Sequence, residues 1–232
     1  LLLGYGADTS LSGHGTAEDI VMRRGHQDLL HFLHAWEERL PERPEAEAAL
    51  VEMLIADAPP ADSPIDVASM RDFAGRPFLQ EVARANAARS IEWLVAQGAE
   101  VDTPDAIGFT ALFEAARDGQ AEAVAALLAQ GADVNHRARE NALSLTALHM
   151  AATGNHPDIV GLLLEAGADP DVQGRMGATP LMWAVFEGSR EAAAVLLEAG
   201  ADASIATNDG TRFSDIARQR GWDDLAAQAE AD

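Results

Sequence analysis

The chain has 232 residues, of which 48% are apolar and only 5% aromatic. Its core must therefore be built mainly from Leu, Ala, Val and Ile, and such a core favours many thin, similar layers over one thick centre. The 38 acidic and 16 basic residues, all of the bases arginine, give a formal net charge of -22, which disfavours nucleic acids and anionic membranes as partners because phosphate binding needs clustered cations. Cysteine is absent, no signal segment opens the chain, and no apolar run reaches the roughly 18 residues of a membrane span, so we predict a soluble, cytoplasmic protein.

The first 34 residues are predicted to hold the end of one helical repeat and a cap-like second one. Leu1 to Asp8 has the pattern of a helix end followed by a Gly-Ala-Asp turn, and Thr16 to Leu30 has that of a short helix pair. The chain begins in mid-repeat and without methionine, so we expect further repeats upstream of Leu1. About one and a half repeats cannot cover their own apolar face, so this part is expected to pack against another part of the chain or to be ragged.

Residues 35–71 are predicted to be a connector, because prolines interrupt any long helix there. These prolines are Pro41, Pro44, Pro59, Pro60 and Pro64. Inside the connector, Glu52-Met-Leu-Ile-Ala56 aligns with Glu92-Trp-Leu-Val-Ala96, a second-helix segment further along the chain. We therefore predict a lone second helix at about residues 45–57 that caps the array following it.

From residue 72 onward the chain repeats itself. A Gly-Ala-acid tripeptide begins at Gly98, Gly131, Gly167 and Gly200, at spacings of 33, 36 and 33 residues. A helix start precedes each tripeptide by 21 residues, reading Pro77-Phe-Leu-Gln, Thr110-Ala-Leu-Phe, Thr146-Ala-Leu-His and Thr179-Pro-Leu-Met. Threonine can accept from the free N–H groups of a first helical turn, and proline suits the first helical position because it lacks an N–H.

Each unit is predicted to contain two short helices. Between them stand Asn86, Gly119, Asn155 and Gly188, residue types that tolerate positive φ. Apolar residues spaced by three and four give the second helices one buried face; they are Ile91, Leu94, Val95, Val124, Leu127, Leu128, Val160, Leu163, Leu164, Ala193, Leu196 and Leu197. The last copy, from about Thr207, is more polar, which predicts a terminal cap.

The units resemble ankyrin repeats, whose pattern has a Gly-x-Thr-Pro-Leu-His start, a Gly between two helices and a closing Gly-Ala-Asp. The best copy runs from Ser144-Leu-Thr-Ala-Leu-His149 through Ile159-Val-Gly-Leu-Leu-Leu164 to Gly167-Ala-Asp169. The resemblance implies an all-α solenoid of helix–turn–helix repeats joined by β-hairpin-like loops. The array with its C-terminal cap then spans 72–232, and 1–34 is the end of an upstream array. At His149 the resemblance implies a structural hydrogen bond.

Ankyrin proteins usually bind a partner through the hairpin tips and the adjoining face of the first helices. The resemblance places these positions at Phe73, Arg76, Arg84, Ile107, Phe109, Arg117, Leu143, Leu145, Arg175, Met176, Phe186 and Glu187. Loop tips that bind no partner would be polar. Several of the positions given above instead carry large apolar groups interleaved with arginine, as interface cores do. We expect Phe109 and Arg117 to lie near the centre of the interface, because repeats flank them on both sides.

The sequence contains no pattern of a nucleophile elbow, a zinc protease or a phosphate-binding loop. His26, His31 and His34 sit among Leu and Phe residues, so we interpret them as part of a packing helix and predict no metal site. We therefore predict a monomeric protein–protein interaction module without cofactor or catalytic activity. Two alternatives stay open: a regulatory or substrate-recruiting part of a larger enzyme whose catalytic domain lies outside this sequence, or a purely structural spacer.

Overall fold

Eleven helices make up the regular structure of the described residues, which are 45–61, 67, 70–71, 75–139 and 143–231 of the computed structural model. The first helices of the repeats are α4 (Phe78–Arg84), α6 (Ala111–Arg117), α8 (Ala147–Thr153), α10 (Pro180–Glu187) and α12 (Phe213–Gln219). Their second helices are α5 (Ala88–Ala96), α7 (Ala121–Ala129), α9 (Pro157–Glu165), α11 (Arg190–Glu198) and α13 (Asp223–Ala231). A lone helix, α3 (Glu45–Ile55), precedes them.

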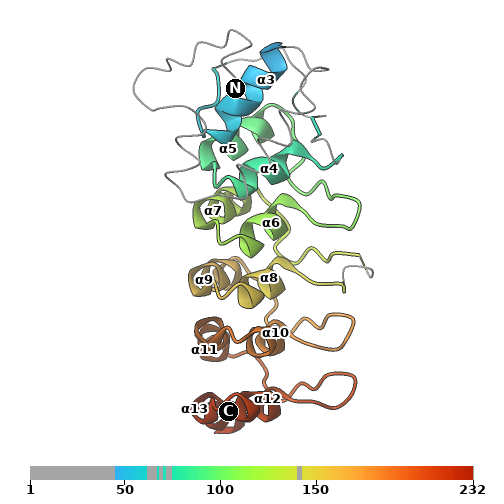
Figure 1. Ribbon diagram of the computed structural model, residues 1–232, viewed down its shortest axis with the longest axis vertical. Helices are drawn as coiled ribbons and strands as arrows, with labels where there is room; N and C mark the ends of the chain where they lie inside the picture. Colours follow the sequence, from blue (N-terminus) through green and yellow to red (C-terminus); the bar gives the residue numbers. More distant parts are fainter. Residues whose placement is uncertain (1–44, 62–66, 68–69, 72–74, 140–142, 232) are drawn as a thin grey trace.

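The helix pairs stack along the long axis of the molecule (Figure 1). The first helices form one column, and the second helices form another column beside it. Irregular loops lead from each second helix to the next first helix and project outward from the column of first helices. The predicted all-α solenoid of helix–turn–helix repeats is therefore confirmed.

The turns between paired helices have positive φ, as predicted. Gly119 has a φ of 76°, and Asn86 and Asn155 have 57° and 56°. The asparagines also have a second role, which their tolerance of this conformation did not predict. The side-chain oxygen of Asn86 accepts from the Ala123 N–H of α7 at 2.9 Å, and that of Asn155 accepts from the Ala192 N–H of α11 at 3.1 Å. Each asparagine thus satisfies a free N–H in the first turn of a neighbouring repeat's second helix.

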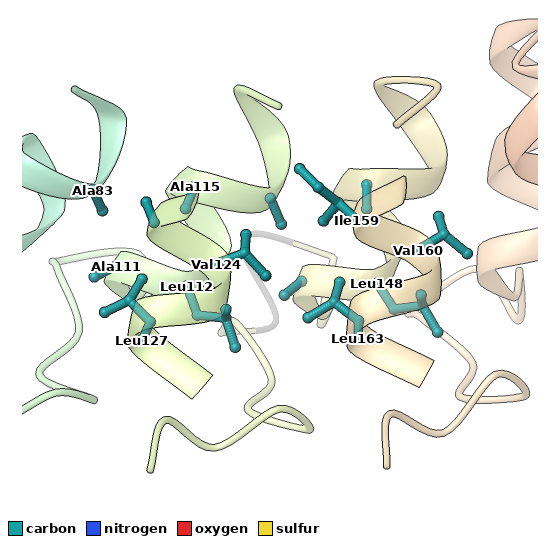
Figure 2. Close-up of a cluster of buried hydrophobic side chains, with 14 of the residues drawn as sticks. Ala83, Ala111, Leu112, Ala115, Val124, Leu127, Leu148, Ile159, Val160 and Leu163 are labelled. Carbon is teal, nitrogen blue, oxygen red and sulfur yellow. The ribbon is translucent and has the colours of Figure 1, made fainter. Parts of the chain in front are cut away.

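One continuous hydrophobic core runs through the stack from Leu50 to Ala226. The same fully buried layer recurs in neighbouring helix pairs, as Leu112, Val124 and Leu127 and then as Leu148, Val160 and Leu163 (Figure 2). Small buried residues such as Ala115 and Ala151 allow the first helices to approach closely. Because each pair buries its apolar face against its neighbours, the stability of one repeat depends on the repeats beside it.

Helix α3 lies within the predicted range of 45–57 and packs against α4. It contributes Leu50 and Leu54 to the continuous core. Asp57 follows the helix with a φ of 57°, and its Oδ1 accepts from the Ser90 N–H of α5 at 2.9 Å. This is the same kind of bond that the asparagines make between later repeats, so the turn after α3 is fixed to the array in the same way.

His149 links α8 to the loop that precedes α10. Its Nδ1 accepts from the Thr146 N–H at 3.1 Å, so its Nε2 carries the proton and donates to the carbonyl oxygen of Ala178 at 3.3 Å. The structural hydrogen bond implied for His149 is therefore present. Gln80 stands in the matching position of the first repeat and donates to the carbonyl oxygen of Phe109 at 2.7 Å. A different side chain thus preserves the same contact with the following loop.

Burial lowers the pKa of His149 to about 4, because the imidazolium form would lose its hydration. The unfolded chain takes up a proton near pH 6.5 that the folded chain takes up only near pH 4. We therefore expect the free energy of unfolding to fall by about 3 kcal/mol as the pH drops through this window. Urea unfolding as a function of pH, on the protein and on His149→Met, measures this effect; the variant copies Met182 of the next repeat.

The difference between the two proteins isolates His149, because their other titrating groups are the same. We expect that difference to shrink as the pH falls from about 7 to about 4. A difference that stays constant over this range would contradict the assignment of a neutral, buried His149.

Candidate protein-interaction face

The loops and first helices share one side of the solenoid, which we call the hairpin face (Figure 1). Its loops are the described residues of 102–109, 133–145, 169–178 and 202–211. Backbone N–H groups join each loop tip to the next; these bonds run from Arg139 to the Ile107 carbonyl (3.1 Å), from Arg175 to that of Leu143 (2.8 Å) and from Asn208 to that of Met176 (3.0 Å). The tips are thus held in a row, and a partner would meet a preformed surface.

The hairpin face is charged over α4 and α6. The side chains of Glu81 and Glu114 are only 1% and 3% exposed, which requires nearby cations. Arg76 pairs with Glu81, and Arg84 lies between the two carboxylates, with its nitrogen atoms 3.8 Å from each. Since Glu81 and Glu114 belong to different repeats, Arg84 ties the first repeat to the second.

Arg117 completes this charged network from the end of α6. Its guanidinium contacts Glu114 and donates to Asp118 at 2.8 Å. Burial raises the pKa of Glu114 and outweighs the lowering by Arg117 and Arg84. Burial also acts to raise the pKa of Asp118, but hydrogen bonds from Arg117 and Arg84 bring it below its usual value. The three arginines of the network are therefore all paired with carboxylates of the same protein.

Apolar side chains line the hairpin face from the loop before α6 to α10. Phe109 stacks on Phe113, with ring centroids 4.0 Å apart, and Met150 and Trp183 pack against the same cluster. Trp183 meets Phe186 edge to face, with centroids 6.3 Å apart. We call Phe109, Met150, Trp183, Phe186 and Met176 the apolar tract. It runs along the face from the second full repeat to the fourth.

The apolar tract reaches solvent at α10. Met176 and Phe186 are 47% and 37% exposed, and with Ile107 at 39% they are the exposed large hydrophobic side chains among the described residues. Beside Met176 and Phe186 lies a groove of about 560 Å³. It is lined by Leu143, Arg175, Met176, Ala178, Phe186, Thr207, Asn208, Asp209 and Thr211.

The predicted contact residues distribute over these regions. Phe73 lies outside the described residues. The charged network contains Arg76, Arg84 and Arg117, while Phe109, Leu143, Leu145, Met176 and Phe186 belong to the apolar tract or pack beside it. Arg175 lines the groove, Glu187 is exposed at the end of α10 and Ile107 is exposed at its loop tip.

Four further residues of this face were not selected from the sequence. Glu81, Glu114, Met150 and Trp183 occupy one position in successive repeats, directly after the position of His149 in its own repeat. The side chain at that position changes from glutamate in the first two copies to Met and Trp in the next two, while the two residues that follow it are Ala or Val in each copy. Variation at a fixed position of a regular repeat is the signal that could have identified them as surface-determining residues.

Neither a metal centre nor a membrane span is found within the part of the chain that the structure describes. No group of three His, Asp or Glu side chains there could hold a metal ion. His26, His31 and His34 lie outside that part. None of the described helices combines the length and the hydropathy needed to cross a membrane.

Stacked helix pairs with loops on one side define a helical repeat protein with an extended binding surface. A family model for ankyrin repeats in three copies matches residues 45–138 and 135–207, which is more than half of the chain, and the chain belongs to this family. No curated protein matches it. Ankyrin repeats are generally protein–protein interaction modules.

Replacing Arg84 tests the buried network. Arg84→Met removes the cation between Glu81 and Glu114, and we expect a loss of about 3 kcal/mol in the free energy of unfolding, because two buried carboxylates lose a partner. Arg190→Met is the control, since Arg190 and its partner Asp224 are 40% and 66% exposed and such pairs add little. Urea unfolding measures both variants, and equal losses would show that the charged network has no special role in stability.

Proposed function

We propose that the chain binds another protein through the hairpin face, with Met176 and Phe186 as the main anchors. The observation that supports this proposal most directly is their exposure, 47% and 37%, on a chain whose net charge is -22. Single exposed apolar residues are common and need no explanation. These two belong to the apolar tract and line a groove, which is the arrangement typical of binding sites.

The surroundings of the two anchors favour tight binding from few contacts. Trp183 supports the ring of Phe186, and backbone hydrogen bonds hold the loop that carries Met176. Side chains and loops that are already ordered lose little entropy when a partner binds. Aromatic residues and methionine are also enriched in the centres of protein interfaces.

Phe109 and Arg117 remain part of the proposed face. The ring of Phe109 is committed to its stack with Phe113, and the guanidinium of Arg117 is committed to Glu114 and Asp118. Changing either residue would therefore disturb contacts within the protein as well as contacts with a partner. For this reason we place the energetic centre of the interface at α10.

We also propose that the protein acts as a cytoplasmic monomer and binds neither nucleic acid nor membranes. The support is the excess of 38 acidic over 16 basic residues, together with the internal pairing of Arg76, Arg84 and Arg117. Binding alone, without catalysis, accounts for the features of the face. If the array instead recruits a substrate for an enzyme domain elsewhere in a longer protein, it would use the same face.

Truncating the two anchors tests the proposed face. We expect Met176→Ser and Phe186→Ser each to weaken partner binding by about 1–3 kcal/mol, as loss of interface anchors does, with little change in melting temperature. The intact chain and both variants would be used to capture partners, which are then compared by quantitative mass spectrometry and titrated. Arg190→Glu is the control on a second helix and should retain every partner. Undiminished binding by both serine variants would refute the assignment.

A further inference from the structure

The groove beside the anchors is fixed by backbone contacts between three loops. Asn208 donates its backbone N–H to the Met176 carbonyl and its side-chain N–H to the Arg175 carbonyl, both at 3.0 Å. Gly177 permits this approach, because its φ is +76° and a Cβ there would lie 2.6 Å from the Asn208 Oδ1. The Arg175 N–H in turn donates to the Leu143 carbonyl at 2.8 Å. The shape of the groove is therefore set before any partner binds.

The groove has the size and the lining for an apolar group. Leu143, Met176, Ala178 and Phe186 supply apolar surface, and the volume of about 560 Å³ lies well within the range of pockets that take small ligands or large side chains. Phe186 connects the groove to Trp183 of the apolar tract. A peptide segment lying along the tract would therefore pass over the groove and could place one large side chain in it.

Arg175 supplies the charge of the groove. It is exposed, and it makes no ion pair with any residue that the structure describes. Arg84, Arg190 and Arg218 are paired with carboxylates of the chain itself. Arg139 and Arg212 share with Arg175 the lack of an ion pair to a described residue, but Arg175 is the arginine that lines the groove. On a protein with 38 acidic residues, an arginine that stays available at the edge of an apolar groove is suited to a carboxylate from outside.

Asp209 restricts where that carboxylate can lie. It lines the groove from the next loop, and its carboxylate accepts from the Thr207 hydroxyl and from the Thr211 N–H. These hydrogen bonds lower the pKa of Asp209, so it stays ionised near neutral pH and repels an acidic group. A bound acidic residue is therefore directed toward Arg175 and away from Asp209.

We propose that this groove binds an extended peptide segment of the partner, with one large apolar side chain over Phe186 and Met176 and a neighbouring carboxylate paired with Arg175. The inference rests on the proposed function and specifies the partner chemistry at the same face. The carboxylate and guanidinium can form two parallel hydrogen bonds, a geometry that favours acid over amide or alcohol at this place.

Selection from a random peptide library, displayed on phage and captured by the intact chain, tests the proposal. We expect the enriched peptides to share an aromatic or large aliphatic residue within a few positions of Asp or Glu. The same selection on Arg175→Glu should lose the acidic residue and enrich Lys or Arg in its place. Arg190→Glu makes the same charge reversal on a second helix and should enrich the same peptides as the unchanged protein.

Fluorescence anisotropy then measures one enriched peptide and its version with the acid replaced by amide. We expect Arg175→Glu to weaken the acidic peptide by about tenfold and to leave the amide version nearly unchanged. Met176→Ser and Phe186→Ser should weaken both peptides, because both rely on the apolar contact. Melting curves of each variant confirm that binding is compared among folded proteins.

The proposal would be overturned if the enriched peptides lacked an acidic residue, or if Arg175→Glu left binding of the acidic peptide unchanged. Failure to select any peptide, including the case in which only a small molecule occupies the groove, would overturn it as well. These results differ from a failure of the proposed function, in which captured protein partners would be retained after both anchors are truncated. A groove that binds no peptide is still compatible with partner binding elsewhere on the hairpin face.

Discussion

The structure depends on one constraint: a single helix pair cannot bury its own apolar face, so each repeat is completed by its neighbours. The core is therefore continuous from Leu50 to Ala226, and small residues such as Ala115 let adjacent helices approach closely. The same constraint fixes the positions of the loops outside the core. Once the helix pairs stack at a fixed spacing, their loops must lie in a row, and backbone bonds such as that from Arg175 to Leu143 join them into one rigid surface.

That surface has two chemically different halves, which differ at a single position of the repeat. Glu81 and Glu114 occupy it in the first two full repeats, where they are buried and neutralised by arginines. Met150 and Trp183 occupy it in the next two, where they build the apolar tract. A buried carboxylate is costly without cations, so the charged half ties its arginines to internal contacts and is poorly available to a partner. The apolar half needs no internal cations, and its end at α10 is exposed at Met176 and Phe186.

Much of the fold followed from the sequence because its determinants are local. Positive φ at Gly119 and Asn86 depends on residue type, and burial of Leu127 depends on spacing along one helix. The candidate site was harder to predict, because its contacts join residues about one repeat apart, such as Arg84 with Asp118. The groove is harder still, since it combines three loops whose approach depends on Gly177 and on the side chain of Asn208. Periodicity identified the hairpin face, but it could not tell which of its side chains make contacts within the protein and which are exposed to a partner.

The most direct test of the account is amide hydrogen exchange of the chain with and without a captured protein partner. Exchange protection reports which backbone segments a partner covers or stabilises. The account predicts slower exchange in the loops 169–178 and 202–211 and at the end of α10 upon binding, with α9 and α11 nearly unchanged. Protection confined to the second helices, with those loops unaffected, would contradict the assignment of the hairpin face as the binding surface.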